Sequence, residues 1–135
     1  MAVDVSGIWH NEYGSEVELK VVDQRRLVGW FRSRTGLARS PHELSGFVSG
    51  SLVTFTVDFS SHGSFTAWTG HLVAEHGTRR IHASWNMCVE VPHNRADDLW
   101  RGIWTGADTF EPGPAPEEQV EVPALQVSHP SPEWP

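Results

Sequence analysis

The clearest pattern in this chain is a strict alternation of apolar and polar residues over short stretches. Two stretches show it best, with apolar residues at Val17, Leu19 and Val21 and at Val53, Phe55, Val57 and Phe59. Alternation with a period of two gives a β-strand one dry face and one wet face. No stretch repeats its apolar residues with helical spacing. The pattern therefore predicts an all-β protein.

Turn residues divide the alternating stretches at intervals of about 8–12 positions, as at Ser49-Gly50 and Glu75-His76-Gly77. The divided pattern predicts strands near residues 6–11, 16–22, 26–33, 43–48, 51–59, 64–73, 78–90 and 99–110. Short links favour antiparallel neighbours. Closing eight such strands into an up-and-down β-barrel removes the exposed strand edges. An eight-stranded barrel has an interior that side chains fill or that holds one small ligand.

The composition changes at Glu111, which divides the chain into a barrel at 1–110 and a tail at 111–135. The stretch from Glu111 to Glu118 is rich in proline and acidic residues, which is typical of an extended or disordered segment. Two interpretations of the tail stay open. It is a solvated extension, or residues 123–135 fold back onto a barrel mouth and compete with a ligand.

Size and charge narrow the range of partners. The 135 residues suit one domain, and the net charge is −7. No basic stripe is present, which argues against nucleic acid, and we expect Arg32, Arg34 and Arg39 to form a solvated rim. No apolar run approaches the roughly 20 residues of a membrane span. The first residues lack the basic and apolar regions of a signal peptide. We therefore expect neither a nucleic acid nor a membrane as a partner.

The candidate functional residues are polar side chains that the alternation points inward. They are Asn11, Ser15, Ser33, Ser64, Thr66 and Asp108. Each costs about 1–3 kcal/mol if it is buried without a hydrogen-bond partner. They could satisfy one another or hold water. Gathered with Trp68, Trp85 and Trp100, however, they match the usual make-up of a small-molecule site, which has aromatic walls and a few convergent polar groups.

Other chemistry has little support in the sequence. The eight His residues show no metal-ligand spacing, so we expect no metal site and solvated imidazoles. No nucleophile elbow or pair of inward carboxylates is present, so we expect no catalysis and no cofactor. Cys88 is the single cysteine and should point outward, because its neighbour Met87 points inward. It packs as a small hydrophobe or lies at a subunit contact.

Three segments together resemble the motifs of the avidin family. Gly7–Ser15 resembles the opening motif G-x-W-x-N-x-x-G-S, and Phe65–Gly70 resembles the strand T-x-W-[ST]-G. Trp85, Trp100 and Gly106–Phe110 resemble the closing motif. The matches fall in the expected order over about 5–110. The likeness is greatest to bacterial avidins with Phe on the fifth strand and a C-terminal extension. It implies an avidin-like barrel that binds biotin tightly and non-covalently, forms a homo-oligomer and is secreted or periplasmic.

The resemblance also implies a role for each site residue. Asn11 and Ser15 would donate to the ureido oxygen of biotin, and Asp108 and Ser33 would accept from its two N–H groups. Phe31 stands where most of the family has a Tyr, so a third donor to that oxygen is missing. Thr66 would contact the sulfur, and Ser64 the valerate carboxylate. The ring would be walled by Phe59, Trp68, Trp85 and Met87. Trp100 would cap the site of a neighbouring subunit, in a dimer or a tetramer.

Two other functions stay open at this point because of Phe31. One is a lipocalin-like small barrel that binds a different small ligand. The other is a barrel that has lost its ligand and serves as an interaction module. Both predict the same fold, so a ligand-binding measurement separates them from biotin binding.

Overall fold

The computed structural model describes residues 4–34, 39–91 and 100–116. Their strands are β1 (Gly7–His10), β2 (Glu16–Val22), β3 (Arg26–Arg32), β4 (His42–Ser49), β5 (Leu52–Phe59), β6 (Ser64–Glu75), β7 (Thr78–Val89) and β8 (Ile103–Pro112). One turn of 3₁₀ helix, η2 (Ser60–His62), joins β5 to β6. The first seven strands occupy the stretches that the alternation predicts.

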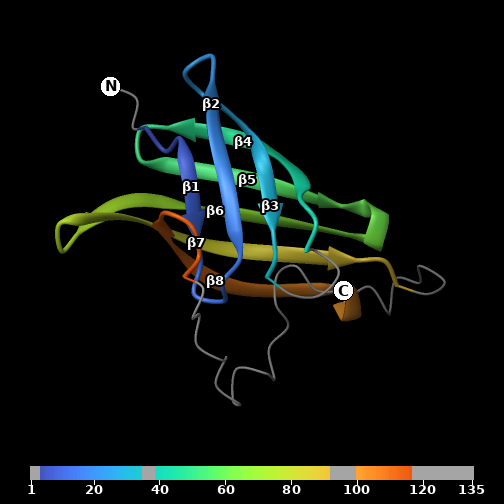
Figure 1. Cartoon of the computed structure of the whole chain (residues 1–135). Coiled ribbons are helices and arrows are strands. Elements are labelled where there is room, and N and C mark those ends of the chain that lie inside the picture. The colour runs from blue at the N-terminus through green and yellow to red at the C-terminus, as the bar shows by residue number, and fades with distance from the viewer. Residues whose placement is uncertain (1–3, 35–38, 92–99, 117–135) are drawn as a thin grey trace.

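The strands form a closed barrel in which each one pairs antiparallel with the next (Figure 1). Closure comes from β1 and β8, where His10 pairs with Glu111 and Trp9 with Pro112. The Gly113 amide adds a 2.7 Å hydrogen bond to the Ile8 carbonyl. The predicted eight-stranded up-and-down barrel is confirmed.

The last strand differs from its prediction at both ends. It was expected over 99–110, but it begins at Ile103 and ends at Pro112. Glu111 and Pro112 therefore belong to β8 rather than to an extended tail, because the barrel closes only when they pair with β1. Beyond them, the Ala115 amide donates to Glu16 on β2 at 2.7 Å. Residues 117–135, including the segment expected to fold back, lie outside the described residues.

Inward side chains from every strand form one apolar core. Its largest fully buried members include Trp9, Trp68, Phe31, Phe55, Phe59 and Phe110. Burying an apolar side chain of this size stabilises the fold by roughly 1.5–3 kcal/mol. The Trp9 indole N–H reaches the Val5 carbonyl at 2.9 Å, so its polar atom is satisfied inside the core. Cys88 is exposed on the outer surface, as its parity predicts.

The outer surface differs between the two sides of the barrel. On β2 and β3 it carries charged residues, including Glu16 and Arg32, which form a 2.5 Å ion pair. On β5 to β8 two rows of small uncharged residues cross the sheet in register. We call these rows the neutral face: Thr56, Ala67, Asn86 and Thr105, then Thr54, Thr69, Ser84 and Ala107.

Candidate functional site

The predicted polar residues gather at one end of the barrel, which we call the mouth. In a barrel of consecutive antiparallel strands, the connections after β1, β3, β5 and β7 lie at the same end. Asn11 and Ser15 lie in the first of these connections, Ser33 follows β3, and Ser64 begins β6. All six predicted polar residues, which include Thr66 and Asp108, are buried. The topology thus brings together residues that are far apart in sequence.

Asp108 is held by two donors, one on β6 and one in the connection after β1. Its Oδ2 accepts a 2.9 Å hydrogen bond from the Trp68 indole and a 3.4 Å bond from the Asn11 amide nitrogen. A buried carboxylate with well-placed donors is a strong and oriented acceptor. Asp108 is only 2% exposed, so a ligand N–H that reaches it forms a bond shielded from water.

Asn11 is oriented by the loop that it begins. Its Oδ1 accepts 3.0 Å bonds from the backbone amides of Tyr13 and Ser15. Gly14 provides the left-handed conformation of this turn, with φ 83°. Since the side-chain oxygen is bound to the loop, the amide nitrogen points toward Asp108. That nitrogen carries two hydrogens, so it can donate to Asp108 and to a ligand oxygen together.

Aromatic rings form the opposite wall. Phe31 is fully buried, stacks on Trp68 with centroids 5.3 Å apart, and meets Phe59 edge to face at 5.6 Å. The Phe31 ring supplies no donor, so this part of the wall is apolar. Phe55 stacks on Trp68 at 5.2 Å. Sequence reasoning did not single out Phe55 for the site, although its inward parity was visible.

Trp85 and Met87 continue the wall on β7, and both are buried. Gly106 on β8 makes room for the Trp85 indole, because a Cβ at this position would lie 2.3 Å from the ring. Trp104 shares the alternation of Asp108 and Phe110 on β8 and pairs with Met87, but it is 41% exposed. It lies one residue from the start of β8, where the sheet ends and leaves the side chain beside solvent.

His42 packs beside the aromatic wall at the mouth while staying partly exposed. Its ring lies 4.9 Å from Phe59 and 5.4 Å from His62. The pairing of Phe31 with His42 across β3 and β4 places the His42 ring at this position.

Two hydrogen bonds from Ser60 lower the pKa of the nearby Asp58 carboxyl. Among the described residues no group of three or more His, Cys, Asp or Glu could hold a metal ion.

Trp100 lies just before β8 and is 69% exposed, with the Arg101 guanidinium over its ring at 5.5 Å. It is therefore not part of the buried cluster of its own chain.

Among residues 4–34, 39–91 and 100–116, no helix is long and apolar enough to cross a membrane.

Comparison with known proteins identifies the fold family. The model of the Avidin family matches residues 1–113. The chain belongs to the Avidin family. The crystal structure of xenavidin is similar with a TM-score of 0.74 and 24% identity, over 84% of this chain and 100% of that one. The crystal structure of the rhizavidin–biotin complex is similar with a TM-score of 0.69 and 29% identity, over 85% and 100%. That of apo shwanavidin has a TM-score of 0.67 and 24% identity, over 81% and 98%.

Proteins of the Avidin family bind biotin and are not enzymes. The geometry of this avidin-family chain agrees with a binding role. Its site holds one oriented carboxylate, several neutral polar groups and an aromatic wall, an arrangement that suits recognition of a polar, uncharged ring.

Proposed function

We propose that this protein binds one biotin molecule per barrel, non-covalently and tightly, at the mouth. The observation that carries the proposal is the placement of Asp108. Its carboxylate is buried, and Trp68 and Asn11 hold it in orientation. The ureido group of biotin is planar, with one acceptor oxygen and two N–H donors. A site for it needs a strong acceptor on one side and donors on the other.

The remaining residues take their roles from this orientation. Asp108 and Ser33 accept from the two ureido N–H groups, and Asn11 and Ser15 donate to the ureido oxygen. Thr66 contacts the sulfur. Ser64, at the start of β6, meets the far end of the valerate chain. The ring is enclosed by Phe59, Trp68, Trp85 and Met87. Because these groups sit on rigid strands, little conformational entropy is lost on binding.

Phe31 sets this site apart from one with a tyrosine at the same position. A tyrosine hydroxyl there would add a third donor to the ureido oxygen. Its absence weakens binding by about 0.5–2 kcal/mol, the usual contribution of a hydrogen bond.

We also propose that the protein is a homo-oligomer, at least a dimer. The neutral face supports this, because depletion of charged residues marks the centre of protein–protein interfaces. A second copy of the chain is the occupant that closes such an assembly by symmetry. Trp100, exposed beside the mouth, is placed to cover the site of a neighbouring subunit. We further propose secretion or a periplasmic location, in keeping with the family.

The test of biotin binding uses biotin-agarose and calorimetry. We expect the chain to be retained on the resin, released by free biotin, and titrated to one biotin per chain. Retention that free biotin does not compete would mean non-specific adsorption. A folded barrel by circular dichroism that shows no retention and no heat would contradict the proposal. It would favour a different small ligand or an interaction module.

A further inference from the structure

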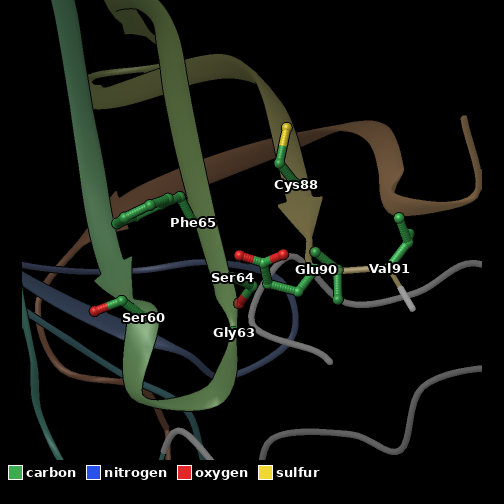
Figure 2. Close-up of a pocket in the computed structure, with 8 residues that line it drawn as sticks. Ser60, Gly63, Ser64, Phe65, Cys88, Glu90 and Val91 are labelled. Atoms are coloured by element: carbon green, nitrogen blue, oxygen red, sulfur yellow. The ribbon is translucent and has the colours of Figure 1, made fainter. Parts of the chain in front are cut away.

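A hollow opens at the mouth, between the start of β6 and the end of β7 (Figure 2). It measures about 330 Å³. Gly63, Ser64 and Phe65 line it on one side, and Cys88, Val89 and Glu90 on the other. None of the binding roles derived above uses Glu90. We call this feature the Glu90 hollow.

Ser64 connects the Glu90 hollow to the biotin site. Its side chain belongs to the inward set of β6 and is 3% exposed, and it also lines the hollow. Its Oγ has no hydrogen-bond partner within the described part of the chain. A buried hydroxyl without a partner is unfavourable and marks a position where a ligand atom completes the bonding. A ligand atom bonded to the Ser64 Oγ would lie next to the other residues that line this hollow.

Glu90 gives the Glu90 hollow its charge. Its amide donates a 2.9 Å bond to the Gly63 carbonyl, which ties the end of β7 to the turn before β6. Figure 2 shows its carboxylate beside Ser64. Gly63 has a φ of 77°, which favours glycine, and a Cβ there would make only an ordinary contact with the Glu90 side chain at 3.7 Å. Glu90 is the one ionisable carboxylate, Lys or Arg among the residues lining this hollow.

We propose that the Glu90 hollow receives the group attached to the carboxyl of biotin and selects neutral or cationic amides over the free acid. The proposal rests on the proposed biotin binding. Free biotin ends in a carboxylate, which would lie near the carboxylate of Glu90. An amide-linked conjugate removes that charge, and a cation on the linker replaces repulsion with attraction. The apolar side chains of Phe65 and Val89 suit an alkyl linker.

The expected size follows from Coulomb's law at a water-exposed position. Two unit charges about 6 Å apart change an equilibrium constant roughly threefold at the dielectric constant of bulk water. At about half that dielectric constant, they change it roughly tenfold. Salt reduces the effect, because the Debye length is about 8 Å at physiological ionic strength. The selectivity should therefore be modest and strongest in dilute buffer.

The experiment measures the dissociation constants of three ligands that differ only in charge beyond the valerate carbonyl. They are biotin, its primary amide and its N-(2-aminoethyl) amide, with charges of −1, 0 and +1 at neutral pH. The protein variants are wild type, Glu90→Gln and Glu18→Gln. Glu18 lies on β2 across the barrel from β6, so its substitution makes the same change in net charge away from the hollow.

For wild type, we expect the neutral amide to gain roughly three- to tenfold over the acid, relative to the same comparison in Glu90→Gln, and the cationic amide, whose charge differs from that of the acid by two units, to gain more. The neutral amide should therefore fall between the other two ligands, and Glu18→Gln should behave as wild type. The same ligand preference in Glu90→Gln and wild type would overturn the proposal while leaving biotin binding intact. An equal change in Glu18→Gln would also overturn it, because net charge would then be the cause. Failure of all three ligands to bind would refute the proposed function itself.

Discussion

The two halves of the barrel, β1–β4 and β5–β8, differ on both of their surfaces. Outside, the first half carries charged residues such as Glu16 and Arg32, whereas the second half carries the neutral face. Inside, the first half supplies neutral groups, among them Asn11 and Ser33. The second half supplies Asp108, the one buried carboxylate among the described residues.

The comparison shows how a strand can serve two purposes. Successive side chains on a strand point to opposite faces, so evolution can choose each face independently. The faces remain joined by one backbone. A second copy that packs on the neutral face would therefore support the strands whose inner side carries Trp68, Trp85 and Asp108. The first half carries charged side chains such as Glu16 and Arg32 on its outer surface.

The largest expected effect tests the inner difference between the halves. Asp108→Ala removes the charged acceptor of the second half and should weaken biotin binding by about 2 kcal/mol or more, equivalent to roughly 30-fold. Ser33→Ala removes a neutral acceptor of the first half and should cost only about 0.5–1.5 kcal/mol. Calorimetry or competition with a labelled biotin measures both. A loss under tenfold for Asp108→Ala, or an equal loss for Ser33→Ala, would break the comparison.

The next effect tests the outer difference. Thr69→Arg places an uncompensated charge in the neutral face and should shift the assembly from oligomer to monomer, because burying such a charge costs several kcal/mol. Val28→Arg introduces the same residue on the outer side of β3 and should leave the molar mass unchanged. Light scattering across a concentration series measures both. If Val28→Arg dissociates the protein and Thr69→Arg does not, the interface lies on the other half.

A smaller effect is expected from restoring a donor to the first half. Phe31→Tyr should strengthen biotin binding by about 0.5–2 kcal/mol, since its hydroxyl can donate to the ureido oxygen. The substitution should act mainly on the dissociation rate, and a competition assay would follow it. Unchanged or weaker binding in a variant with wild-type thermal stability would mean that Phe31 does not face the ureido oxygen.

The smallest effect concerns acid and the charged outer side. Burial opposes ionisation of Glu16, but hydrogen bonds from Arg32 and from the Ala115 amide outweigh it and lower its pKa. A carboxyl with a lowered folded-state pKa stabilises the fold above its unfolded value, 4.5, and loses that contribution as the pH falls through the folded value. Wild type should exceed Glu16→Gln in unfolding free energy by roughly 0.2–1 kcal/mol at pH 7.

Thermal unfolding from pH 7 to pH 3 measures this difference. The gap between wild type and Glu16→Gln should shrink once the pH passes below 4.5. Thr69→Ser on the neutral face should show a difference from wild type that does not change with pH, because neither residue titrates. A gap that stays constant for Glu16→Gln would show that its charge does not stabilise the barrel.

Much of the fold could be predicted because strand alternation is local. The parity of Ser64, Thr66 and Trp68 follows from their spacing alone, and the structure buries all three. The predicted end of β8 at residue 110 was wrong. Glu111 and Pro112 are strand residues only because they pair with β1, which lies at the opposite end of the chain. The exposure of Trp104 does not follow from its parity, because parity does not show where a sheet stops.

The sequence by itself determined which residues face inward, how many strands there are and which polar residues need an explanation. It also contained the avidin-family motifs. The tertiary structure decided what those residues touch. The bonds of Asp108 to Trp68 and Asn11, the stacking of Phe31, the neutral face and the Glu90 hollow all join separate strands. Such contacts depend on strand register and barrel closure, and no local pattern of residues specifies either.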